Sequence, residues 1–257
     1  MQVLLLILLA NLVSTGVSLS LAALLSFRWL AGLVDRLVHV SIGLLLTTAF
    51  VHLMPEALAG GIPPVLLGWT LLMGILALFV LEKLTLLHHT HHHEGDGHNH
   101  GHGHDAQQLG RGAYPILIAD AFHNFTDGIV IAAAFLVDLR AGLITALAVL
   151  AHEIPHEIGD FMILLNAGMP RRRAFGFLLL SGSAAVLGGL SGFFLLAAMQ
   201  SLLPYALALA AASFIYIALS DLLPELMRRS SLHDSLPEVG FVFLGVLLAL
   251  LAMLVDG

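Results

Sequence analysis

HEIPHEIGD, residues 152–160, places two histidines, two glutamates and an aspartate inside an otherwise apolar run that extends from residue 142 to residue 167. A run of about 20 apolar residues is long enough to cross a bilayer as a helix. Ionisable side chains at that depth cost about 2.5–3.5 kcal/mol each on insertion scales, and they mark functional sites. The stretch therefore predicts a membrane helix that carries a polar site.

The composition of the whole chain agrees with a membrane protein. Hydrophobic residues make up 59% of the 257 residues and charged residues only 11%, against about 45–50% and 25% in soluble domains. The few charges form no basic patch, which argues against a nucleic-acid partner. The chain has no cysteine, so any metal must be held by nitrogen and oxygen atoms.

The apolar runs predict an all-α polytopic membrane protein with eight transmembrane helices in a single domain that covers residues 1–257. The first run has no positively charged segment before it and is longer than a signal peptide needs, so we interpret it as a span. The eight spans are expected near residues 3–26, 38–59, 65–87, 114–137, 142–167, 174–199, 203–227 and 239–255.

Basic residues predict the orientation. With eight spans, all but Arg140 of the basic residues lie in loops on one side, and the positive-inside rule places that side in the cytoplasm. Both termini are then outside, and we expect a multi-pass protein of the plasma (cell inner) membrane. The residues on the cytoplasmic side are Arg28, Arg36, Lys83, Arg111, Arg171, Arg172, Arg173, Arg228 and Arg229.

A short sequence occurs twice, in spans that are predicted to run in opposite directions. His52-Leu-Met-Pro-Glu56 ends the second span, and Asp221-Leu-Leu-Pro-Glu225 ends the seventh. Inverted repeats are common in transporters, with the binding site between the halves. The alternative is that Leu-Pro-Glu simply ends a membrane helix at the interface, and the two readings stay open.

The fourth span carries a second polar cluster. Asp120, His123, Asn124 and Asp127 are spaced i, i+3, i+4 and i+7, so they share one helical face. Imidazole and carboxylate ligands suit Zn²⁺, and also Fe²⁺, Mn²⁺ or Cd²⁺, better than Na⁺ or K⁺. We therefore expect the metal to be a transported substrate, with no catalytic cofactor.

On the fifth span His152, His156 and Asp160 stack on one face, and Glu153 and Glu157 stack beside them. We expect the two histidines to bind one ion together with ligands from the fourth span.

Pro155 lies between these ligands. It has no N–H to donate to the carbonyl of Ala151, so we expect that carbonyl to line a polar cavity at the depth of the site.

Residues 88–111 are expected to form a disordered cytoplasmic loop. Glycine, asparagine and aspartate separate its histidines, and such spacing favours weak binding of several metal ions. The predicted loop ligands are His88, His89, His91, His92, His93, His98, His100, His102 and His104.

These motifs resemble those of the ZIP (Zrt/Irt-like) divalent metal transporter family, in the branch with an HExPHE motif in the fifth span. The resemblance covers nearly the whole chain, through the His123-Asn124 and Asp127-Gly128 pairs, the motif at 152–157, the His-rich loop and the eight spans. It implies an inverted three-helix repeat around the fourth and fifth helices, metal influx toward the cytoplasm, and often a homodimer.

Carried over residue by residue, the resemblance implies a main site of His123, Asp127, His152 and His156. A second site would use Asn124 and Glu153 and would share Asp127 and His156. Further accessory residues from the sequence are Asp120, Glu157, Asp160 and His52.

Two departures from the family pattern bear on selectivity. Family members commonly have Glu at the position of Asp127, whose side chain is shorter. Members with a two-metal centre add a carboxylate from the sixth span, and residues 174–199 contain none. Ser181 or Ser183 would replace it poorly, which puts occupancy of the second site in doubt.

The main alternative is an enzyme, because His152-Glu153-x-x-His156 also fits the zinc-protease pattern H-E-x-x-H. A proline inside that motif disturbs the helix that such proteases need, and an intramembrane protease gives no role to His123. A cation exporter of the diffusion-facilitator class also has His-rich loops, but it usually has six spans and a soluble metal-binding domain. We therefore expect a transporter of divalent metal ions and not an enzyme.

Overall fold

The computed structural model describes residues 1–25, 31–90, 106–222 and 232–254, and nearly all of them are helical. The elements are α1 (Gln2–Leu25), α2 (Ala31–Thr47), η2 (Thr48–Leu53), α3 (Met54–Ala59), α4 (Pro64–Thr90), α5 (Ala106–Val137), α6 (Leu139–Asn166), α7 (Arg171–Gly182), α8 (Ala184–Ala198), η3 (Gln200–Leu202), α9 (Leu203–Ile217), η4 (Ala218–Leu222) and α11 (Leu232–Leu254). This confirms the predicted all-α architecture.

The predicted spans fall on these helices wherever the chain is described; residues 26, 223–227 and 255 of the predicted spans lie outside the described residues. In the described part of the chain, 7 helical segments are long and apolar enough to cross a membrane. The fifth span, α6, is the exception by composition, although its 28 residues make it longer than a bilayer requires. Its buried histidines and carboxylates lower its mean hydropathy. The polar residues that mark the site are therefore also the reason why hydropathy alone does not identify α6 as a membrane span.

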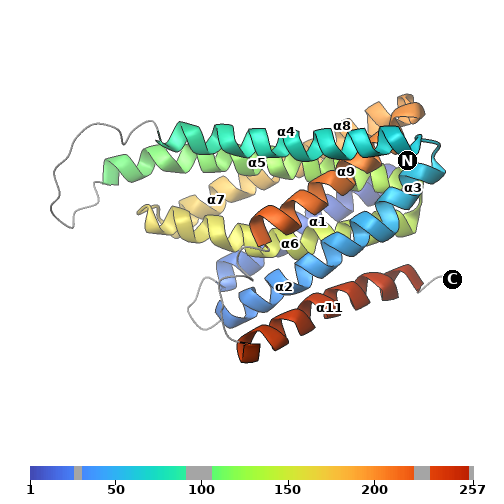
Figure 1. Ribbon diagram of the computed structural model, residues 1–257. Coiled ribbons are helices and arrows are strands. Elements are labelled where there is room, and N and C mark those ends of the chain that lie inside the picture. Colours follow the sequence, from blue (N-terminus) through green and yellow to red (C-terminus); the bar gives the residue numbers. More distant parts are fainter. Residues whose placement is uncertain (26–30, 91–105, 223–231, 255–257) are drawn as a thin grey trace.

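The helices run side by side along one direction (Figure 1). Helix α1 begins and α11 ends at one end of this bundle, and α4 ends and α5 begins at the opposite end. An even number of crossings, as the sequence predicts, brings both termini to the same side. Which side is cytoplasmic stays a prediction from the basic residues.

Two pairs of helix contacts are reciprocal. Helix α1 packs on α6, and α8 packs on α5; likewise α2 packs on α11, and α9 packs on α4. In an inverted repeat α1 corresponds to the sixth span, α2 to α9, α4 to α11, and α5 to α6. Under this correspondence the α1–α6 contact becomes the α8–α5 contact, and the α2–α11 contact becomes the α9–α4 contact. This reciprocity is what an inverted repeat around α5 and α6 predicts.

The two Leu-x-Pro-Glu repeats, at 53–56 and 222–225, each begin where a π-helical segment ends; residues 223–225 lie outside the described residues. A π-helical segment, η2, ends at Leu53, and a second one, η4, covers Ala218–Leu222 at the corresponding place in the seventh span. After η2 the chain continues as α3, with Pro55 in its first turn, so this motif does not end the helix. A wider π turn before a proline accommodates the missing N–H.

Small residues allow α5 and α8 to approach closely. A Cβ atom on Gly128 would lie 2.0 Å from the carbonyl oxygen of Ala185, and one on Gly188 would lie 1.9 Å from the carbonyl oxygen of Phe125. Backbones meet this closely only where glycine lines both surfaces. The contact fixes α5 against the sixth span directly beside Asp127.

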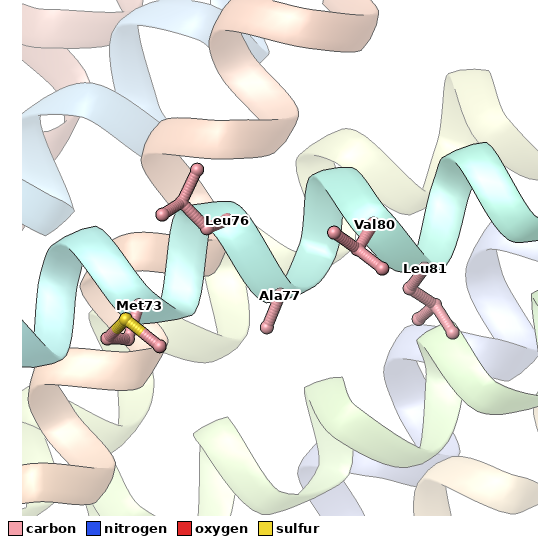
Figure 2. A pocket seen from close by; sticks show the side chains of 5 residues that line it. All are labelled: Met73, Leu76, Ala77, Val80 and Leu81. Atoms are coloured by element: carbon pink, nitrogen blue, oxygen red, sulfur yellow. The ribbon is translucent and has the colours of Figure 1, made fainter.

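The outer helices present apolar side chains that suit lipid. Only 11% of the hydrophobic window of α4 and 17% of that of α11 are buried, against 61% for the second span. Met73, Leu76, Ala77, Val80 and Leu81 line a shallow apolar hollow on α4 (Figure 2). Exposed apolar surface on this scale is typical of helix faces that contact lipid or another protein.

Two segments differ from their predicted boundaries. The sixth span begins earlier than predicted, at Arg171, and consists of α7 and α8, which meet at Ser183 while the backbone of Ser183 keeps helical angles. Helix α4 continues to Thr90 and α5 begins at Ala106, so both ends of the predicted loop 88–111 are helical. The helices continue beyond their apolar segments because a membrane helix can extend into water. Residues 91–105, with seven of the predicted loop ligands, lie outside the described residues.

Candidate metal centre

Helices α5 and α6 hold most of the polar residues singled out in the sequence, and a tight turn joins them. Helix α5 ends at Val137 and α6 begins at Leu139, with Asp138 between them. The Asp138 carboxylate accepts a 2.7 Å hydrogen bond from the backbone N–H of Ala141, which caps the first turn of α6. Two antiparallel helices are thereby held together along the depth of the site.

The carbonyl of Ala151, which Pro155 leaves without its usual helical donor, has a partner. Ser41 on α2 donates a hydrogen bond of 2.6 Å to it. The carbonyl thus accepts a hydrogen bond from a neighbouring helix, and the expectation that it lines a polar cavity was wrong. A membrane helix can tolerate proline when a neighbouring serine satisfies the freed backbone group.

Four side chains form the first ligand group, namely His123 and Asp127 from α5 with His152 and Glu153 from α6. His152 Nε2 lies 3.0 Å from Asp127 Oδ2, and His123 Nε2 lies 3.3 Å from Glu153 Oε1. One donor atom from each residue lies within 4.8 Å of all the others. Two imidazoles and two carboxylates match the ligand types and the ligand number that Zn²⁺ takes in proteins.

His152 shows why this group needs a cation. Its Nδ1 atom lies 3.0 Å from the carbonyl oxygen of Ala148; a carbonyl only accepts, so Nδ1 carries the proton. In the neutral ring the lone pair of Nε2 then faces Asp127 and, at 3.8 Å, Glu153. Lone pairs that face one another are stable only with a positive species between them, which is a proton or a metal ion.

A second ligand group lies beside the first and contains Asp120, His156 and Asp160. His156 Nδ1 is 3.9 Å from Asp120 Oδ1 and 3.7 Å from Asp160 Oδ2. The rings of His123 and His156 have centroids 5.0 Å apart, so the two groups adjoin.

The grouping differs from the one that the family resemblance implies. In the structure Glu153 completes the first group, and His156 joins the second. Asn124 lies in neither group; its amide donates to Asp120 Oδ1 at 2.9 Å.

Two accessory candidates also lie outside the described groups. Glu157 is fully buried and neither of its oxygens has a hydrogen-bond partner. A Cβ atom on Gly182 would lie 3.7 Å from its Oε1, so Glu157 faces α7. His52 lies in η2, and its Nε2 atom is buried without a hydrogen-bond partner.

The sixth span does contribute to the site, through a serine. Ser181 donates a short hydrogen bond to Asp120 Oδ2, whereas Ser183 bonds only to the carbonyl of Leu180 in its own helix. A hydroxyl that donates to a carboxylate orients that carboxylate without adding negative charge. Ser181 thus acts on the second group indirectly.

Sequence reasoning missed a polar face on α1. Asn11, Ser14, Thr15 and Ser18 are buried and are spaced i, i+3, i+4 and i+7, which is the signal that could have found them. Thr15 donates to the carbonyl of Gly182 at 3.3 Å. This face fastens α1 to α7 close to Glu157, through hydroxyl and amide groups that carry no charge.

Comparisons with known proteins identify the family. The sequence profile described as ZIP Zinc transporter matches residues 86–253, which include both ligand groups. The chain belongs to the ZIP zinc transporter family.

Relatives in this family share a large part of the sequence. Zinc transporter ZIP13 of Pongo abelii is 33% identical over 241 residues, which cover 86% of this chain and 67% of the relative. Zinc transporter ZIP6 of Homo sapiens is 39% identical over 132 residues, which cover 51% of this chain and 18% of the relative. The metal cation symporter ZIP14 of Danio rerio is 40% identical over 134 residues, which cover 52% and 27%.

The chain therefore spans less than a third of the length of ZIP6 and ZIP14 and two thirds of ZIP13. The ZIP family, which the sequence motifs indicated, is thus confirmed. The relatives described above carry the names of transporters, so the protease alternative gains no support from them.

Proposed function

We propose that the protein transports a divalent transition metal ion, Zn²⁺ in the first place, across a membrane. The ion binds to His123, Asp127, His152 and Glu153 between α5 and α6. The metal is the transported substrate and the protein catalyses no chemical reaction.

One observation carries this proposal. His152 and Glu153 have side chains that are only 1% and 2% exposed, and the ligand atoms of both lack hydrogen-bond partners. An imidazole nitrogen and a carboxylate buried in this way are costly unless a cation binds between them. Four carboxylates beside three imidazoles in the two ligand groups favour a doubly charged ion; these carboxylates belong to Asp120, Asp127, Glu153 and Asp160.

Zinc is the preferred candidate because the donor set is nitrogen and oxygen in equal number. Such a set suits zinc, and it also accepts Fe²⁺, Mn²⁺ and Cd²⁺. The names of the relatives support zinc: ZIP6 and ZIP13 are named zinc transporters, and ZIP14 is named a metal cation symporter. The short side chain of Asp127 is the feature that would change the preference among these ions.

The direction of transport follows from the predicted orientation. The basic residues place the connection between α4 and α5 in the cytoplasm, where its histidines would accept the arriving ion. We therefore propose influx toward the cytoplasm through a plasma (cell inner) membrane, by a protein that assembles as a homodimer. These points rest on the charge distribution and on the family resemblance.

Uptake of ⁶⁵Zn²⁺ into proteoliposomes tests the proposal. Purified protein should give saturable uptake that Asp127→Asn abolishes, because an amide replaces the carboxylate between the two imidazoles. The matched control is Asp138→Asn, since asparagine caps a helix as well as aspartate does. Equal uptake by protein-free and protein-containing vesicles would contradict the proposed function, and so would normal uptake by the Asp127 variant.

A further inference from the structure

The second ligand group lies along the same two helices, displaced in one direction from the first. His156 and Asp160 follow His152 by one and two turns of α6, and Asp120 precedes His123 by about one turn of α5. Because the helices are antiparallel, both displacements point toward the beginning of α5 and the end of α6. One turn corresponds to about 5.4 Å along the helix axis. The second group is therefore one step nearer the end of the bundle where α4 connects to α5.

The spacing of the second group fits a cation. Its two histidine–carboxylate distances, 3.7 and 3.9 Å, are too long for hydrogen bonds. Ligands that each lie about 2.0–2.2 Å from a tetrahedral zinc ion are roughly 3.3–3.5 Å apart. His156 Nδ1 is buried and has no hydrogen-bond partner. The three donors thus lie within 4.8 Å of one another, slightly farther apart than the ligands of one bound zinc ion, and do not hydrogen-bond to one another.

Asp120 is held in place by two donors. Its Oδ1 accepts from the amide of Asn124 at 2.9 Å, and its Oδ2 accepts from the hydroxyl of Ser181. Outer partners that orient a ligand in this way are a regular feature of built metal sites. They give Asn124 and the sixth span a role that the first group does not require.

Exposure differs between the two groups. In the first group the side chains of His152 and Glu153 are 1% and 2% exposed and that of His123 is 20% exposed. In the second group the side chain of Asp120 is fully buried, whereas those of His156 and Asp160 are 37% and 13% exposed. The second group also has one ligand fewer. Fewer ligands and more contact with solvent both weaken binding. An ion that passes from the first group to the second therefore moves from a tight site to a weaker and more open one.

We propose that Asp120, His156 and Asp160 form a second, weaker cation site that receives the ion from the first group and releases it toward the end of the bundle where α4 connects to α5. The transfer rests on the proposed function, whereas binding of an ion to this group does not.

Equilibrium dialysis with ⁶⁵Zn²⁺ tests the binding. The full chain is used with its nine loop histidines replaced by glutamine, because those residues would add ions of their own. This background protein should bind two zinc ions, the second on the order of tenfold more weakly. Asp160→Asn and His156→Gln should each lose the weaker ion and keep the tight one, with its affinity changed less than threefold.

The same variants separate this proposal from the site that the family resemblance implies. If His156 belongs to the main site, His156→Gln loses the tight ion, and the assignment of His156 to a separate group is overturned. Retention of two ions by Asp160→Asn overturns it as well. Asp138→Asn, a change of the same kind at the other end of α6, should keep both ions.

Uptake into proteoliposomes tests the transfer. Asp160→Asn should lower the maximal rate at least fivefold without raising the zinc concentration for half-maximal uptake, because entry into the first group is unchanged. An unaltered maximal rate contradicts the transfer. If the unmodified protein moves no zinc, the proposed function fails, while the two-ion stoichiometry still decides whether the second site exists.

Discussion

Ser41 and Ala151 are joined by a hydrogen bond of 2.6 Å that crosses from α2 to α6. The acceptor is the carbonyl that Pro155 deprives of its helical donor, and it immediately precedes His152. The bond therefore ties α2 to α6 one residue before His152, whose Nε2 lies 3.0 Å from Asp127 Oδ2.

Replacing Ser41 should disturb both stability and metal binding. Ser41→Ala leaves a buried carbonyl unsatisfied, which costs about 1–3 kcal/mol, and it frees the turn beside His152. We expect a lower unfolding temperature and several-fold weaker zinc binding, while Ser41→Thr, which keeps the hydroxyl, stays close to normal. Thr70→Ala is the control, because Thr70 bonds only to the carbonyl of Leu66 within α4. If Ser41→Ala behaves like Thr70→Ala in calorimetry, the bond has no positioning role.

Two serines near the point where α7 meets α8, Ser181 and Ser183, should behave differently. Ser181→Ala removes the hydroxyl that holds Asp120, so the weaker zinc ion of the second group should bind several-fold less tightly. Ser183→Ala removes a hydroxyl that bonds only within its own helix, so it should leave zinc binding unchanged. Titration calorimetry of the two variants in parallel decides the point. Equal effects of the two substitutions would show that Ser181 does not position Asp120.

Much of the helical architecture was predictable, because an apolar run of about 20 residues has few stable structures other than a transmembrane helix. The same holds for the shared face of Asp120, His123 and Asp127, which depends only on the helical repeat. The division of these residues into two groups was not predictable. It depends on how far α5 is shifted along α6, and that offset is set by packing between helices.

Two other features, the donor to the Ala151 carbonyl and the role of Ser181, could not be predicted from the sequence. Pro155 predicts an unpaired carbonyl at Ala151, but nothing near it in the sequence names Ser41, which lies 110 residues away, as the donor. The role of Ser181 was underestimated for a related reason. A serine is a poor metal ligand, and only the structure shows that it acts on a carboxylate instead.

Gly128 should be sensitive to the smallest enlargement. The Cβ of an alanine there would lie 2.0 Å from the backbone oxygen of Ala185, so α5 and α8 would have to separate. Overpacking of this kind costs about 1–3 kcal/mol, and it would shift the neighbouring Asp127. Gly128→Ala should lower the unfolding temperature and reduce zinc uptake.

Gly159→Ala is the matched control for that substitution. A Cβ atom there meets nothing within 4 Å, and alanine favours a helix over glycine by about 1 kcal/mol. The control should be as stable as the unmodified protein or more so. A Gly128 variant as stable and active as the Gly159 variant would contradict the close α5–α8 contact.

The His-rich segment should be dispensable for transport itself. Residues 88–104 are rich in histidine and glycine, a composition that favours solvation over packing. Replacing them with a neutral linker should leave zinc uptake in place and alter its apparent affinity. Uptake and membrane insertion are measured on the same preparation. Complete loss of uptake by correctly inserted protein would make the segment part of the translocation path.

The central claim is that two imidazoles and two carboxylates hold the transported ion, and X-ray absorption at the zinc edge tests it most directly. The protein without loop histidines is loaded with one equivalent of zinc, so that the tight site is filled first. We predict a four-coordinate shell of nitrogen and oxygen at about 2.0–2.1 Å, with the outer scattering of two imidazole rings, of which one disappears in His152→Ala. A shell of oxygen atoms alone, or imidazole scattering that His152→Ala leaves unchanged, would contradict the account.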